Sequence, residues 1–197
     1  MPWLILVLTI SLFIALARGG RISNLADIEL RLWWLLILGF VIQAVAGLFP
    51  SWGFVQAAGP WILVASYIPI VVAVTANREK AGMWLAGVGI LMNLSVIIAN
   101  QGMPVLTGAI TAASDFTIDN PVVANFKHVP YDDETVLGFL ADVIPLRVFG
   151  QGHVISLGDV LLAIGLGRFL EGELRKPVRW FKGGVGPTES GSAFTQS

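Results

Sequence analysis

Residues 91–105 read LMNLSVIIANQGMPV and decide how the rest of the chain is interpreted. The run is apolar, but it contains four polar side chains and ends in a glycine and a proline: Asn93, Ser95, Asn100, Gln101, Gly102 and Pro104. Amides inside an apolar segment long enough for a bilayer are costly unless they are hydrogen-bonded. We therefore expect functional polar groups to lie along this segment and at its end.

The composition indicates a membrane protein. The chain has 197 residues, of which 55% are hydrophobic and only 13% are charged, whereas a soluble domain carries about 25% charged residues. The net charge of −1 gives the chain no general attraction for nucleic acid. The absence of cysteine excludes disulfides, thiolate metal sites and a cysteine nucleophile.

Five apolar stretches approach the roughly 17–25 residues that a transmembrane helix needs. They are residues 2–17, 32–49, 61–75, 82–100 and 155–170. A sixth stretch, 135–149, is interrupted by Asp142, Pro145 and Arg147, and its apolar residues follow helical spacing. We interpret it as a helix that lies on the surface or re-enters the bilayer. The predicted fold is an all-α membrane protein, with a bundle of five transmembrane helices and one interfacial or re-entrant helix.

The basic residues predict the orientation of this bundle. With five spans, ten of the twelve basic residues fall on one side: Arg18, Arg21, Arg31, Arg78, Lys80, Arg168, Arg175, Lys176, Arg179 and Lys182. The positive-inside rule then places the N-terminus outside and the C-terminus in the cytoplasm. All seven tryptophans fall at the predicted membrane interfaces, which supports this threading. We expect residues 1–182 to form a single transmembrane domain and the Gly/Ser/Thr-rich residues 183–197 to form a disordered tail.

A cleaved signal peptide is the alternative interpretation of the first stretch. Residues 15–17 read ALA and resemble a cleavage site, but no basic residue precedes the apolar run. We therefore favour a retained first helix.

Polar side chains in the second and fourth spans are predicted to lie at similar depth. Gly39, Gln43 and Gly47 share one face of the second span, so that another helix can approach closely and bond to Gln43. Gln43 and Asn93 each lie about eleven residues from the inner ends of their helices and could pair. Two interpretations stay open: these amides hold the bundle together, or they line a cavity for a solute.

Two further polar groups are expected on the outer side. Asn100 follows Asn93 by seven residues, on the same helical face. Ser156 and Asp159 have the spacing of a capping box at the start of the last helix. Asp159 either serves only as this cap or, as an acid close to membrane depth, binds a cation or exchanges a proton.

The predicted outer loop, residues 101–134, is long enough to pack over the bundle. Lys127 is its only basic residue and is expected to pair with a carboxylate or with a headgroup phosphate. His128 and His153 are the only histidines, and the chain has no HExxH motif. Walker, GxSxG and kinase motifs are also absent. We therefore expect neither a metal site nor a cofactor.

Several short pieces together resemble a bacterial integral membrane family known as a domain of unknown function. They are Gly19-Gly20-Arg21, Leu91-Met92-Asn93, Asn100-x-Gly102-Met103-Pro104, Lys127-His128 and Ser156-x-Gly158-Asp159. The resemblance covers roughly residues 1–175 and implies a small multi-pass protein of the bacterial inner membrane. It implies no activity, substrate or catalytic residue.

Our functional hypothesis is a protein that binds or passes a small polar solute, an ion or a lipid headgroup at an outward-facing site. The expected lining is Gln43, Asn93, Asn100 and Asp159, with Lys127 and His128 as lid contacts. One alternative is an accessory or scaffold subunit. The other is a membrane-embedded enzyme acting on a lipid, with His128 or Asp159 as acid or base. We favour a protein that is not an enzyme and assign no catalytic residue. The expected partners are membrane lipids, a solute or ion, and another membrane protein or a second copy of the chain.

Overall fold

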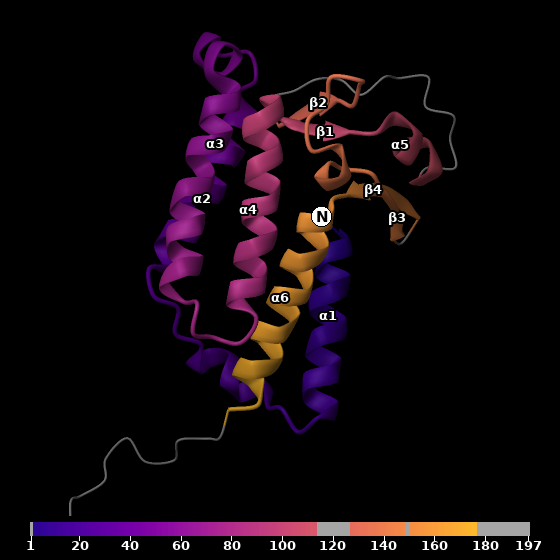
Figure 1. Ribbon diagram of the computed structural model, residues 1–197. Coiled ribbons are helices and arrows are strands. Elements are labelled where there is room, and N and C mark those ends of the chain that lie inside the picture. The colour runs from indigo at the N-terminus through magenta and orange to yellow at the C-terminus, as the bar shows by residue number, and fades with distance from the viewer. Residues whose placement is uncertain (1, 114–126, 149, 177–197) are drawn as a thin grey trace, which may run out of the picture.

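The computed structural model describes residues 2–113, 127–148 and 150–176, and this part of the chain is mostly helical (Figure 1). Its long helices are α1 (Pro2–Ala17), α2 (Trp33–Leu48), α3 (Gly53–Ala76), α4 (Met83–Asn100) and α6 (Leu157–Leu174). They run alternately up and down between two ends. The prediction of a mostly helical bundle is therefore confirmed, but the expected all-α fold is wrong, because the described residues also form short strands.

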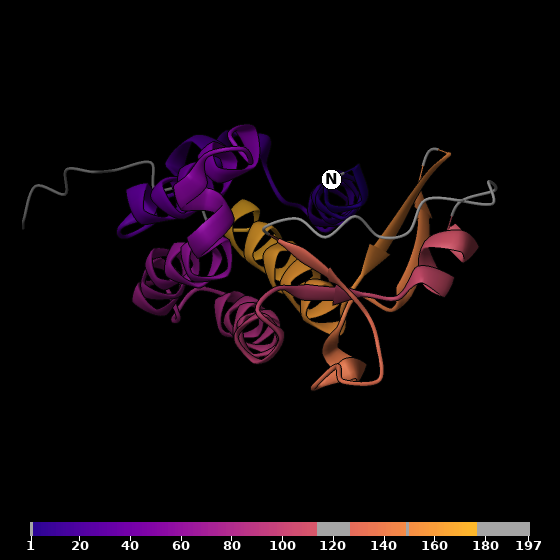
Figure 2. The same ribbon diagram turned by 90° about the horizontal axis from the view of Figure 1, so that it is seen from above.

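The helices form a curved row and not a closed ring. α2 packs against α3, α3 against α4, α4 against α6, and α6 against α1. Figure 2 shows this row from above, with α6 between α4 and α1. The first helix thus packs on the last one, and α6 contacts both α1 and α4.

The helix boundaries agree with the apolar pattern except at α3, which begins at Gly53 and not at residue 61. We expected Pro60 to precede the helix, but the helix continues through Pro60 and Pro69. Among the described helices, α3 and α4 are long and apolar enough to cross a membrane. α1 and α2 are apolar but shorter, and α6 carries several charged residues.

Small strands and short helices cover one end of the bundle, and we call them the cap. β1 (Met103–Val105) pairs in parallel with β2 (His128–Pro130), and β3 (Ile144–Val148) pairs antiparallel with β4 (Gln151–Ile155). α5 (Thr107–Ala113) packs on β3 and β4. The 3-10 helix η2 (Gly138–Leu140) contacts α4 and α6. The bundle therefore has a capped end and an opposite end, which we call the basic end.

The predicted interfacial or re-entrant helix at 135–149 is wrong. This segment contains the single turn η2 and then strand β3. Ile144, Leu146 and Val148 face inward, while Pro145 and Arg147 between them are exposed, which is the two-residue period of a strand. Pro145 also disfavours a helix, because it lacks a backbone N–H and restricts the residue before it.

Glycines bring α4 and α6 into close contact, in a line that we call the glycine seam. A Cβ atom added to Gly89 would collide with the carbonyl oxygen of Gly158, and one added to Gly82 would collide with that of Gly165. The two pairs lie seven residues apart on each antiparallel helix. Small residues at such a contact let two backbones approach closely. The seam leads directly to Asn93, which sits one turn beyond Gly89.

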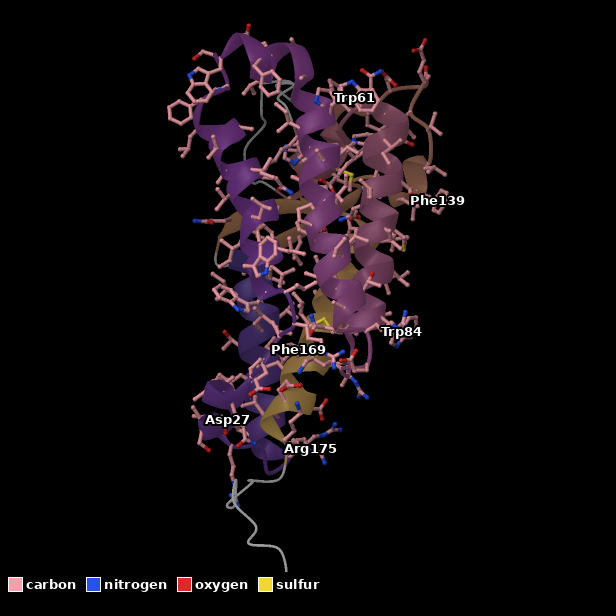
Figure 3. All side chains as sticks on the ribbon, turned by 90° about the vertical axis from the view of Figure 1, so that its left-hand side faces the viewer. Asp27, Trp61, Trp84, Phe139, Phe169 and Arg175 are labelled. Atoms are coloured by element: carbon pink, nitrogen blue, oxygen red, sulfur yellow. The ribbon has the colours of Figure 1, made fainter. Side chains whose placement is uncertain are left out.

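The connections at the basic end are held by asparagines. Asn77, at the end of α3, donates to the carbonyl oxygen of Arg31 and accepts from its N–H. In the 3-10 helix η1 (Ile22–Asp27), Asn24 donates to the carbonyl oxygens of Leu174 and Lys176. The described basic residues of the α1–α2 and α3–α4 connections and of the end of α6 gather here. Figure 3 shows Arg175 at this end and Trp61 toward the other.

Candidate functional site

A hydrogen-bonded group joins the middle of α4 to the start of α6. The Nδ2 of Asn93 donates to Oδ1 of Asp159 at 2.8 Å, and the Oγ of Ser156 donates to Oδ1 of Asn93 at 2.9 Å. Asn93 is only 6% exposed and Ser156 is fully buried. The close packing of Gly89 on Gly158 allows this bonding, because it brings the two helix backbones together.

The predicted capping box at the start of α6 is confirmed. The backbone N–H of Asp159 donates to Oγ of Ser156 at 3.0 Å, and the N–H of Ser156 donates to Oδ2 of Asp159 at 3.3 Å. Both carboxylate oxygens of Asp159 therefore accept a hydrogen bond from within the bundle. Because β4 ends at Ile155, the cap is connected directly to this group.

Gln43 connects α2 to α3 and to the cap. Its Nε2 donates to Oγ of Ser66 at 2.9 Å, and its Oε1 accepts from Nζ of Lys127 at 3.2 Å. Gly39 permits this contact, because a Cβ there would meet the carbonyl oxygen of Ser66 at 2.7 Å. The predicted close approach of a helix at Gly39 and Gln43 is confirmed. The pairing of Gln43 with Asn93 is not observed, since each amide bonds to another helix.

Asn100 fixes a turn of the cap. Its Nδ2 donates to the carbonyl oxygens of Val96 and Val136, and its Oδ1 accepts from the N–H of Val136 at 2.9 Å. The amide thus holds both backbone groups of one cap residue. This explains why an asparagine is the last residue of α4, where an apolar residue would leave the Val136 backbone without these partners.

Asp142 is the functional candidate that the sequence interpretation missed. It forms an isolated parallel bridge with Val105, in which its N–H donates to the carbonyl oxygen of Pro104 and its carbonyl oxygen accepts from Leu106. These backbone bonds carry its side chain inward, where it is only 7% exposed. Its Oδ1 has no hydrogen-bond partner among the described residues. A buried carboxyl oxygen without a partner is an unusual and costly feature.

Asp142 belongs to a group of ionisable side chains that we call the capped-end cluster: Tyr67, His128, Asp142 and Asp159. Burial, and then the charge of Asp159, raises the pKa of Asp142 to about 8. Burial, and then the charge of Lys127, lowers the pKa of His128, although Asp159 acts in the opposite direction. Tyr67, on α3, is within electrostatic range of both aspartates. The cluster therefore brings two acids together with a phenol and an imidazole.

The six predicted site residues divide into two groups in the structure. The amides of Gln43, Asn93 and Asn100 form hydrogen bonds that hold helices and the cap together. Lys127, His128 and Asp159 lie at the junction of the cap and the bundle. The groups with capacity for a ligand are the carboxylates, and their chemistry favours a proton or a small cation. Among the described residues, no three His, Asp or Glu side chains are arranged to hold a metal ion.

A weak signal for Asp142 exists in the sequence. The segment ADVIPL places one acid between apolar residues in a stretch that we interpreted as amphipathic. An acid within an apolar run indicates burial as readily as it indicates a polar face. The helical interpretation hid this, because it treated Asp142 only as an interruption of the apolar stretch.

Comparison with known proteins places the chain in a family. The model of a family of unknown function, DUF5317, matches residues 27–170, and the chain belongs to this family. The match includes the glycine seam, the cap and all members of the capped-end cluster. No curated protein and no solved structure gives a significant match to the chain.

Proposed function

We propose that this chain is a multi-pass membrane protein that binds a small cation, either a proton or a monovalent metal ion, in the capped-end cluster. The membrane part of this proposal is supported by apolar side chains on the outer faces of the helices. Phe13, Leu48, Phe54 and Trp61 are each between 68% and 73% exposed. Water-soluble proteins rarely expose such extended apolar surfaces.

In this arrangement α1, α2, α3, α4 and α6 all cross the bilayer. The alternating direction of the helices and the gathering of basic residues at one end support a cytoplasmic basic end. The exposed Trp33 and Trp84, near the basic end, and Trp61, toward the capped end, suit the two headgroup regions. A bacterial inner membrane remains our proposed location.

Cysteine labelling tests the orientation. The natural chain has no cysteine, so single cysteines at the exposed positions Asp133, in the cap, and Arg78, at the basic end, can be labelled without background. We expect a membrane-impermeant maleimide to label intact cells at position 133 and only lysed cells at position 78. Labelling of position 78 in intact cells would overturn the orientation.

One observation carries the ion-binding part of the proposal. The buried Asp142 presents an oxygen without a described partner, and the charge of the second acid, Asp159, raises its pKa further. Two neighbouring carboxyl groups cannot easily both be ionised, so the pair retains a proton or attracts a cation. The satisfied amides around the cluster hold it in place. Together these features support a binding role for the acids and a scaffolding role for the amides.

Proton release on adding a salt tests the site. The purified chain in lipid nanodiscs is held at a pH near the pKa of Asp142. Sodium or potassium chloride is then added at constant ionic strength, and a pH indicator reports the released protons. The wild type is expected to release about half a proton per chain, because a carboxyl group at its pKa is half protonated, whereas Asp142→Asn releases none. Asp133→Asn is the matched control, because Asp133 is an exposed cap residue. Equal release from the two variants, or no release from the wild type, would reject cation exchange at Asp142.

A further inference from the structure

A second site candidate lies at the basic end, far from the capped-end cluster. A surface pocket of about 170 Å³ lies where the end of α1 meets the last turns of α6. Its lining consists of Arg18, Ala81, Arg168, Glu171, Gly172 and Arg175. Three of these six residues are arginines, although they come from two separate helix ends.

One glutamate arranges the three guanidinium groups. Oε1 of Glu171 accepts from Nη1 of Arg18 at 2.7 Å and from Nη1 of Arg175 at 3.4 Å, while Nη1 of Arg168 lies 3.8 Å from Oε2. The Glu171 side chain is partly buried, with 13% exposed, whereas each arginine side chain is more than half exposed. The glutamate therefore forms the floor of the pocket, and the arginines form its rim.

The pocket keeps a positive charge after this pairing. Three guanidinium groups against one carboxylate leave a formal charge of +2. Each guanidinium has five N–H donors, and two carboxylate oxygens cannot accept from all of them. The nearby acid Glu173 does not cancel the excess, because it pairs with Lys80 at 3.3 Å and with Lys176 at 2.6 Å.

These features suit a phosphate group. The planar guanidinium donates two parallel hydrogen bonds to phosphate oxygens, which makes arginine a preferred phosphate ligand. Because a water molecule occupies about 30 Å³ in the liquid, a pocket of about 170 Å³ has room for a phosphate and some of its hydration. The α6 dipole disfavours an anion here, since the pocket lies at the negative, C-terminal end of that helix. The attraction comes from the arginines alone.

The position of the pocket identifies the class of ligand. If the helices cross a bilayer as proposed above, this end lies at the headgroup level of the inner leaflet. Basic pockets between helix ends on the cytoplasmic side bind anionic headgroups. We propose that Arg18, Arg168 and Arg175 bind the phosphate of an anionic phospholipid of the inner leaflet. This inference relies on the membrane arrangement but not on ion binding at the capped end.

Native mass spectrometry of the full chain, released from mixed phosphatidylcholine and phosphatidylglycerol nanodiscs, tests the proposal. We expect the wild type to retain phosphatidylglycerol over phosphatidylcholine, and Arg168→Gln to weaken this retention about tenfold, as expected for one lost charged hydrogen bond. Arg175→Gln is a second variant with the same expectation. Arg78→Gln is the matched control, because Arg78 is exposed at the same end but does not line the pocket.

Two further arms separate the sources of phosphate and the role of the carboxylate. Inorganic phosphate, titrated into detergent-purified protein, should displace phosphatidylglycerol only weakly. If inorganic phosphate displaces the bound lipid as strongly as added phosphatidylglycerol does, the pocket is assigned to free phosphate and the lipid proposal is overturned. Glu171→Gln should retain the lipid at least as well as the wild type, because it removes a competing anion. Equal loss of lipid from Arg78→Gln and Arg168→Gln would show a general surface charge effect and reject the pocket.

Discussion

Replacing Asp142 with asparagine is expected to change how the stability of the protein depends on pH. Because the pKa of Asp142 is raised to about 8, the folded protein keeps a proton that the unfolded chain releases near pH 4. The folded state therefore binds more protons between these two values, and its stability falls as the pH rises through this window. Asparagine has a similar shape and does not ionise, so this contribution disappears in the variant.

The size of the effect follows from the shift. One extra proton in the folded state changes the free energy of unfolding by about 1.4 kcal/mol per pH unit. Between pH 3.8, the ordinary pKa of aspartate, and neutral pH, the loss in the free energy of unfolding accumulates to roughly 4 kcal/mol as an upper limit. We expect Asp142→Asn to be more stable than the wild type at neutral pH by up to this amount, and the two proteins to converge near pH 4.

Unfolding in mixed detergent micelles, followed by tryptophan fluorescence from about pH 5 to about pH 8, measures this difference. Asp133→Asn removes an exposed carboxylate from the same cap and should follow the wild type at every pH. Parallel pH profiles of the wild type and Asp142→Asn would refute the reasoning. So would a variant that is less stable throughout, because that result requires Asp142 to be ionised and stabilising in the folded protein.

Two more substitutions examine the parts that hold the cluster in place. Gly89→Ala should lower the free energy of unfolding by about 1–3 kcal/mol through overpacking. Gly87→Ala, on the same helix, should be nearly neutral, because its added methyl group meets only a side-chain methyl group of Val74 on α3, at 3.2 Å. Similar losses of stability in both variants would argue against the seam. Asn100→Ala should speed hydrogen exchange at the N–H of Val136 by about tenfold, because one hydrogen bond is lost. Ser95→Ala should leave that rate unchanged, because the exposed Ser95 hydroxyl bonds only to its own helix. Unchanged exchange in the Asn100 variant would show that the turn is held by other contacts.

The helices could be predicted from the sequence because each one is a long apolar segment bounded by polar residues or glycine. The start of α6 was predictable in atomic detail, since the capping box of Ser156 and Asp159 is a local pattern within four residues. The partners of Gln43 and Asn93 were not, because a depth estimate along one helix gives no information about rotation or about which helices are neighbours. The order of the curved row decides those partners, and it depends on packing between distant segments.

The cap was predicted poorly for a physical reason. β1 pairs with β2 from more than twenty residues away, and Asp142 bonds to the other edge of β1 through two backbone hydrogen bonds. Short strands owe their stability to such distant partners, and three-residue strands show no clear period in the sequence. The predicted disordered tail, 183–197, and Trp180 lie outside the described residues.

The glycine seam between α4 and α6 restricts which parts of the molecule can move. The two backbones meet at glycines where a Cβ would collide, so this close contact is possible only while the glycines face each other, and sliding of one helix along the other is disfavoured. Asn93 and Asp159 consequently keep the same position relative to each other, and the α4–α6 pair forms a rigid part of the molecule. Any motion that opens a route to Asp142 must be made by the cap or by the outer helices α1, α2 and α3 turning against this fixed pair.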